Sequence, residues 1–100
     1  MVMLDRAQTI ETLKNARQYL NEHYGVCSMF LFGSFARNEQ KEDSDVDVFV
    51  DTLTPNPFML MEARDYLTKV VNRPVDIIRN HKNLNPRLRR RIEQDGIRVF

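Results

Sequence analysis

The stretch of residues 31–50 constrains the fold of this chain more than any other. In it, an apolar segment ends in Gly33-Ser34, and a second apolar segment carries two aspartates one residue apart. Successive side chains of a strand point to opposite faces, so Asp45 and Asp47 share one face and the alternating valines share the other. The pattern predicts a strand with one face in a core and the other face acidic.

The acidic face is typical of a divalent cation site. Two carboxylates this close repel each other unless a positive charge lies between them. Mg²⁺ prefers oxygen ligands and leaves room for substrate phosphates. Two such ions can clamp the attacking and leaving oxygens of a displacement. An isolated Asp-x-Asp pair is common by chance, however, and a solvated strand end is the better explanation of the pair alone.

The Gly-Ser pair is typical of a phosphate-binding turn. Gly33 directly follows the segment 26–32, which we expect to be a mostly buried strand, and glycine lets a ligand approach the backbone closely. Ser34 can cap a helical turn or donate its hydroxyl to a phosphate oxygen. A helix beginning here would direct N–H groups toward an anion, with Arg37 one turn further on. An ordinary strand-to-helix turn is the better explanation of these residues taken alone.

Helix and strand signals alternate along the chain and predict an α/β (α+β) fold, a mixed sheet with helices packed against it. Asn56-Pro57 and Asn85-Pro86 each place a capping side chain before a proline at the first helical position. The apolar stripe expected on the helix after Asn56 consists of Met59, Ala63, Tyr66, Leu67 and Val70. We expect helices over 5–24, 33–37, 57–71 and 86–95 and strands over 26–32, 44–51, 75–79 and 97–100.

Together, the two motifs resemble those of the minimal nucleotidyltransferases of the DNA polymerase beta superfamily. These proteins carry Gly-Ser, ten residues and then Asp-x-Asp, and here residues 35–44 separate Gly33-Ser34 from Asp45-Val46-Asp47. They also carry a third acid on a later strand, for which Asp76 is the matching candidate. Asn38 departs from the family pattern, which commonly has glycine there, but asparagine tolerates left-handed backbone. The resemblance covers nearly the whole chain and implies the single-domain nucleotidyltransferase fold.

The resemblance also implies an activity. Such proteins use Mg²⁺, here expected as two ions, to transfer AMP from ATP. Stand-alone domains of this kind are similar to antitoxins that add AMP to a tyrosine of a partner HEPN-family RNase toxin. By this resemblance, the third acid would orient or deprotonate the acceptor hydroxyl. The implied residues are Asp45, Asp47 and Asp76 for catalysis and metal binding, and Gly33, Ser34 and Arg37 for nucleotide binding.

Two other functions remain open. The chain is also compatible with a non-catalytic antitoxin that binds and occludes its partner. The intact motif residues argue against complete loss of the catalytic site. It is also compatible with nucleotide transfer to a small molecule such as an aminoglycoside, if an oligomer completed the acceptor pocket. Replacing both Asp45 and Asp47 with asparagine would separate catalysis from occlusion.

Composition narrows the protein class. A length of 100 residues allows one domain, which we expect to span residues 1–100. The 42% hydrophobic content indicates a folded rather than a disordered chain. The net charge of +1 implies no overall attraction to polyanions. The chain lacks an apolar stretch of membrane-spanning length and a signal-peptide pattern, so we expect a cytoplasmic protein without a membrane partner.

Two further features are expected to be structural. The single cysteine, Cys27, lies on an expected strand and is interpreted as a small core residue. The arginine cluster of the last helix has three interpretations, of which a solvated helix face is the commonest and a partner-docking surface the next. A nucleic-acid surface ranks third, because no aromatic stacking platform accompanies the cluster. We therefore expect no direct nucleic-acid binding. The cluster consists of Arg87, Arg89, Arg90 and Arg91.

Overall fold

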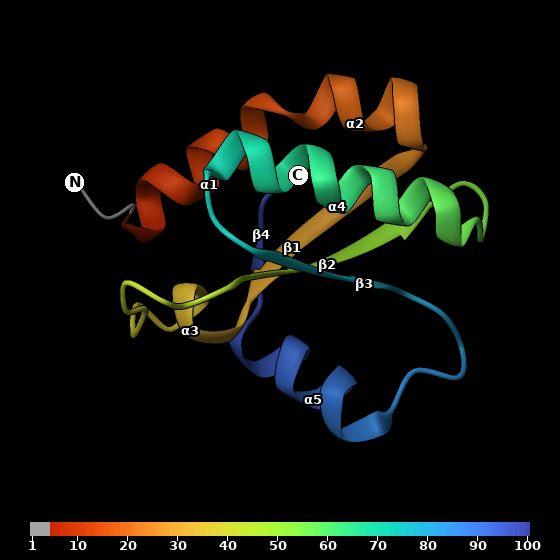
Figure 1. Cartoon of the computed structure of the whole chain (residues 1–100). Helices are drawn as coiled ribbons and strands as arrows, with labels where there is room; N and C mark the ends of the chain where they lie inside the picture. The colour runs from red at the N-terminus through yellow and green to blue at the C-terminus, as the bar shows by residue number, and fades with distance from the viewer. Residues whose placement is uncertain (1–4) are drawn as a thin grey trace.

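A four-stranded mixed sheet organises the protein, and helices lie on both of its faces (Figure 1). The strands of this computed structural model, which describes residues 5–100, are β1 (Val26–Phe32), β2 (Val46–Thr52), β3 (Val75–Arg79) and β4 (Ile97–Arg98). They lie in the order β3-β2-β1-β4. β1 runs antiparallel to β2 and β4, whereas β2 and β3 are parallel. The expected mixed sheet is confirmed.

The helices divide between the two faces of the sheet. Figure 1 shows α1 (Arg6–Asn15), α2 (Arg17–Tyr24) and α4 (Pro57–Val71) on one face and α5 (Pro86–Asp95) on the other. The single turn α3 (Gly33–Ala36) follows β1 directly. α4 makes the crossover that the parallel pair β2–β3 requires. None of the helices within residues 5–100 combines the length and apolarity needed to cross a bilayer.

The first helix differs from the prediction because it is two helices instead of one. α1 ends at Asn15, and the Ala16 N–H donates to Leu13 O at 3.1 Å, a three-residue closure that tightens the last turn. α2 then continues from Arg17. The predicted ends are confirmed: Asp5 caps α1 through a capping box, and Gly25 ends α2 in left-handed backbone with φ of 68°.

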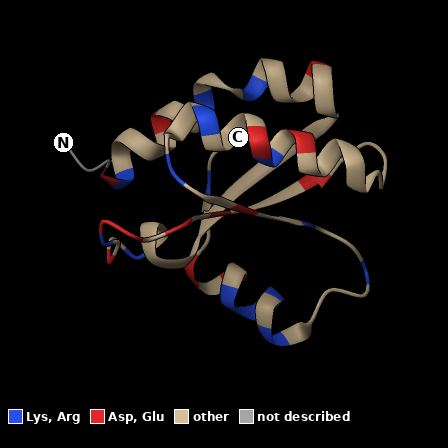
Figure 2. Cartoon of the chain, in the orientation of Figure 1, with Lys and Arg blue, Asp and Glu red and all other residues tan. Residues whose placement is uncertain are grey.

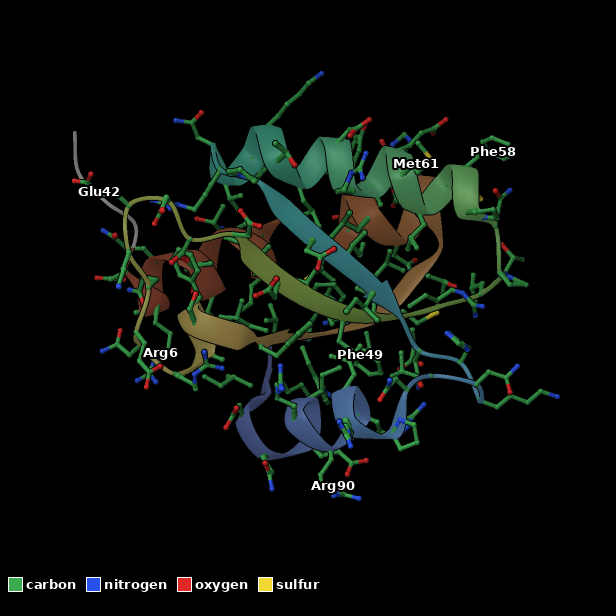
Figure 3. The ribbon with its side chains drawn as sticks, turned by 60° about the horizontal axis from the view of Figure 1, so that its bottom comes forward. Arg6, Glu42, Phe49, Phe58, Met61 and Arg90 are labelled. Atoms are coloured by element: carbon green, nitrogen blue, oxygen red, sulfur yellow. The ribbon has the colours of Figure 1, made fainter. Side chains whose placement is uncertain are left out.

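Alternation along β2 separates the core from the acidic face. Val46, Val48 and Val50 are fully buried on the side of α1, α2 and α4. The intervening side chains therefore face α5, where Phe49 packs against a second, smaller apolar cluster, Phe32, Leu84 and Ile92. Figure 3 shows Phe49 between the sheet and α5. The sheet thus carries its apolar and acidic faces as the sequence predicts, and α5 covers part of the second face.

Cys27 is exposed, so the prediction that it is a core residue was wrong. The pairing of β1 with β2 shifts between Val26, opposite Thr52, and Ser28, opposite Asp51. This β-bulge inserts one residue into β1 and changes which side chains point inward. The sequence shows the apolar composition of the strand but not the local break in its alternation.

The buried stripe of α4 also differs in part from the prediction. Ala63 and Leu67 are fully buried, as expected, but Val71 replaces Val70, which is 37% exposed. Met61 is 52% exposed and therefore does not fill the core. The buried residues 63, 67 and 71 thus recur at a strict four-residue spacing along one side of the helix.

Candidate active site

One pocket brings together all six residues that the sequence singled out. Its volume is about 410 Å³, and it opens where β1, β2 and β3 meet α3 and α5. The predicted residues that line it are Gly33, Ser34, Arg37, Asp45, Asp47 and Asp76. The other lining residues, Phe32, Ile78, Leu88 and Arg91, were not predicted to belong to a site.

Strand register explains why the acids meet. In the parallel pair β2–β3, Asp47 lies opposite Asp76. In the antiparallel pair β1–β2, Asp47 lies opposite Phe32, so the Gly-Ser turn begins beside it. Asp45 directly precedes β2 and shares the parity of Asp47. The pairing of β3 with β2 thus brings Asp76 beside Asp47.

Gly33 packs directly against the side chain of Asp47. Its φ of 76° lies in the left-handed region that favours glycine. A Cβ atom at this position would lie 3.1 Å from Asp47 Cγ and would overlap the carboxylate oxygen Oδ2. The turn therefore requires glycine for two reasons, its backbone conformation and the space that Asp47 occupies.

The Asp47 carboxyl is the most perturbed acid of the pocket. Its pKa is raised from 3.8 to about 6, first by burial and then by the negative charges of Asp76 and Asp45. The positive charge of Arg37 acts in the opposite direction. A perturbed carboxyl in a cleft is a common mark of a functional site. A bound cation would favour the ionised form and relieve the repulsion among the three acids.

This raised pKa predicts a pH-dependent stability in the absence of a divalent cation. Because the folded-state value of about 6 exceeds the ordinary value of 3.8, the folded protein binds the Asp47 proton more tightly than the unfolded chain does. The contribution of Asp47 to the free energy of unfolding should therefore fall as the pH rises from about 4 to about 6, and then remain constant. Asp47→Asn should raise stability near pH 7 by about 1 kcal/mol, a value reduced for solvent screening.

Urea unfolding across this pH range, in the presence of a chelator, measures the effect as the difference between the parent protein and the variant. That difference should grow from acid to neutral pH. A difference that stays constant with pH would contradict the assignment of the shift to Asp47.

Arg37 lines the pocket but is already engaged with two carboxylates. Its Nε donates to Glu39 at 3.0 Å, and its Nη1 lies 3.7 Å from Asp95. The contact with Asp95 connects α3 to the end of α5. The positive charge of Arg37, which we expected to act on a phosphate, is thus partly neutralised by these two acids.

Arg73 positions the loop that leads to Asp45, a role that the sequence did not reveal. Its Nη1 donates to the carbonyl oxygens of Glu42 at 2.7 Å, Ser44 at 2.9 Å and Lys41 at 3.3 Å. Its guanidinium also lies over the Phe35 ring at 5.4 Å. One side chain therefore connects the segment before β3 with both α3 and the acidic loop. Only the neighbouring Pro74, before a strand, marked this segment in the sequence.

The Asn38 position behaves as expected. It adopts left-handed backbone with φ of 58°, and its N–H donates to Phe35 O at 3.2 Å. The departure from the family's glycine therefore leaves the turn after α3 intact.

The oxygen donors of the pocket suit a hard cation such as Mg²⁺. This ion commonly uses one or two carboxylates together with waters and substrate phosphates. Within residues 5–100, no group of three or more acidic, histidine or cysteine side chains is arranged so that it could hold a metal ion by itself. The observation that favours a cation in the pocket is the repulsion of Asp47 by Asp76 and Asp45, which raises the pKa of Asp47.

Comparison with known proteins identifies the family. The family model described as polymerase beta nucleotidyltransferase matches residues 14–100. "Putative protein adenylyltransferase MJ1217" of Methanocaldococcus jannaschii is 38% identical over 90 residues, which cover 89% of this chain and 92% of that protein. "Protein adenylyltransferase MntA" of Thermococcus cleftensis is 35% identical over 79 residues, which cover 78% of this chain and 80% of that protein.

Solved structures agree with this match. A protein described as a "putative minimal nucleotidyltransferase" superposes with a TM-score of 0.76 at 28% identity, covering 97% of this chain and 98% of that chain. A complex of "tri-AMPylated Shewanella oneidensis HEPN toxin" with "MNT antitoxin" contains a chain with the same fold, with a TM-score of 0.65 at 17% identity and coverage of 91% and 71%. This chain therefore belongs to the polymerase beta nucleotidyltransferase family.

Proposed function

We propose that this protein is an Mg²⁺-dependent antitoxin that transfers AMP from ATP to a tyrosine of a HEPN-family RNase toxin in the cytoplasm. The observation that carries the proposal is the meeting of the Gly-Ser turn with three carboxylates in one pocket. Nucleotide transfer from a triphosphate needs both a turn that binds phosphate and an acidic face that binds a cation.

The metal-binding residues in this proposal are Asp45, Asp47 and Asp76. Bound there with the nucleotide, two Mg²⁺ ions would neutralise triphosphate charge and act as Lewis acids at the reacting phosphate. The raised pKa of Asp47 supports this assignment, because the positive charge of Arg37 does not cancel the combined effect of burial, Asp76 and Asp45.

The remaining residues bind and orient the reactants. Gly33 admits the triphosphate close to the backbone, and the Ser34 hydroxyl donates to a phosphate oxygen, while Arg37 adds positive charge. The acceptor tyrosine oxygen attacks the α-phosphorus, and a new O–P bond forms as the bond from that phosphorus to the bridging oxygen breaks. Pyrophosphate leaves with the electron pair. Asp76 accepts the tyrosine proton, which is needed because a phenol has a pKa of about 10.

The proposed acceptor is supported by the relatives. Proteins at 35–38% identity carry the name protein adenylyltransferase, so a protein acceptor is favoured over a small molecule. A HEPN toxin that carries AMP is described in complex with an MNT antitoxin, whose fold this chain shares. These likenesses support the same class of partner for this chain.

The test is to incubate the purified protein with ATP, Mg²⁺ and a HEPN-family protein from the same organism. We expect the intact mass of the HEPN protein to increase by one or more AMP residues, and peptide mapping should locate them on tyrosine. A stable complex without any mass increase, under conditions in which ATP binds, would contradict the proposal and indicate an antitoxin that acts by occlusion.

A further inference from the structure

Arg91 enters the pocket from α5, although the sequence gave it no role there. It lies three residues after Leu88, so the two side chains share one face of the helix. Both line the pocket together with the Gly-Ser turn and the three acids. The acids come from the sheet side of the pocket, on β2 and β3 and just before β2, whereas Arg91 comes from the helix that packs against this face.

The position of α5 is fixed by contacts with the sheet. Ile92 is 4% exposed and belongs to the apolar cluster that Leu88 and Phe49 pack against. The Arg89 Nη2 donates to the Asn80 side-chain oxygen at 2.8 Å and to the His81 carbonyl at 2.9 Å. These contacts orient α5 so that Leu88 and Arg91 line the pocket.

The two pocket arginines differ in their partners. Arg37 is held by Glu39 and Asp95. Arg91, in contrast, has no ion pair with any acidic side chain of residues 5–100. A guanidinium without an acidic partner beside a phosphate-admitting turn has its donors free for an anionic ligand.

The charge distribution favours the same conclusion. Residues 79–100 contain seven of the fifteen Lys and Arg residues but only two of the fourteen Asp and Glu residues. Figure 2 shows this basic character along α5, below the sheet. Arg90, on the same helix, points away from the sheet in Figure 3 and does not line the pocket. Both arginines are exposed to solvent, but only Arg91 also lines the pocket.

We propose that Arg91 is a triphosphate-binding residue, whose guanidinium donates hydrogen bonds to phosphate oxygens of the nucleotide from the α5 side of the pocket. Arg91 then supplies positive charge to the triphosphate, whereas the charge of Arg37 is partly neutralised by Glu39 and Asp95. It also interacts with the pyrophosphate group as that group leaves. This inference deepens the proposed function and depends on a nucleoside triphosphate being the ligand.

The test compares nucleotide binding by Arg91→Ala, Arg91→Lys and the matched control Arg90→Ala, with Mg²⁺ present. Calorimetric titration should show a Kd for ATP about 10- to 100-fold higher in Arg91→Ala, since a hydrogen bond to a charged group contributes roughly 1.5–3 kcal/mol. The Kd for AMP should change much less. Arg91→Lys should recover part of the loss, and Arg90→Ala should bind ATP like the parent protein.

Several outcomes would overturn the inference. It fails if Arg91→Ala binds ATP as tightly as the parent protein does. It also fails if the Arg90 and Arg91 variants lose the same ATP affinity, because that would indicate a general effect of positive charge on α5 rather than a specific contact. Equal weakening of ATP and AMP would show that Arg91 does not select the triphosphate. Thermal unfolding checks each variant, and Arg91→Gln, which keeps the length of the side chain, replaces Arg91→Ala if the latter does not fold.

The same titrations separate this inference from the proposed function. If the parent protein binds ATP in an Arg91-dependent manner but transfers no AMP to the HEPN protein, the inference stands and the proposed function fails. If the parent transfers AMP but Arg91→Ala binds ATP normally, only the inference fails. A parent protein that does not bind ATP would overturn both.

Discussion

Asp45→Asn/Asp47→Asn should lose AMP transfer by at least about 1,000-fold while keeping its fold. The two carboxylates are the proposed cation ligands, and a cation at a transferring phosphate contributes several kcal/mol to the transition state. Asparagine has nearly the same shape, and neutralising Asp47 removes an acid whose raised pKa already disfavours its charge. Transfer is measured as labelled AMP on the HEPN protein, and the fold is measured by thermal unfolding.

Asp43→Asn is the matched control, because it removes an exposed acid of the loop that does not line the pocket. It should transfer AMP at the parent rate. Cells that express the HEPN protein should be protected by the control but not by the double variant. Protection by the double variant at the parent level would contradict a catalytic antitoxin and support occlusion.

Gly33→Ala should reduce both stability and transfer. The alanine would have to adopt a φ of 76°, and its Cβ would overlap the Asp47 carboxylate. The backbone strain alone costs roughly 1–3 kcal/mol. Relief of the overlap moves either the turn or Asp47, and misplacement by about 1 Å can cost about 100-fold in rate. Chemical unfolding and AMP transfer measure the two effects on the same preparation.

Gly25→Ala separates strain from chemistry. Gly25 also has positive φ, at 68°, but a Cβ there would meet only Leu53, at 3.6 Å or more, away from the pocket. This control should lose the stability that backbone strain costs, without the overlap present at Gly33, and keep its transfer rate. If both alanine variants lose transfer in proportion to stability, the close contact between Gly33 and Asp47 has no special role in the site.

Much of this fold was predictable because its signals are local. Asn56 accepts from the N–H groups of Phe58 and Met59 at 2.9 and 3.2 Å, and Pro57 follows it, so cap and proline alone identify the start of α4. The alternation of Asp and Val in β2 likewise needs no partner to be recognised. Asp76 was a different case, because its role depended on which strand β3 pairs with.

The features that escaped prediction depend on distant contacts. The bulge at Cys27 arises from the pairing of β1 with β2, and the carbonyl contacts of Arg73 arise from the packing of a loop far from it in sequence. Arg91 has neighbours of identical type on its helix, so composition cannot distinguish it from Arg90. Only the packing of α5 on the sheet determines which arginine faces the acids.

The pocket draws its walls from residues as far apart in the sequence as Phe32 and Arg91. During synthesis, the Gly-Ser turn and the first two acids emerge long before α5 does. A chain on the ribosome therefore has no complete pocket until residues 86–95 have left the exit tunnel and packed beneath the sheet. In a nascent chain the pocket therefore stays open on the α5 side until that helix has packed against the sheet.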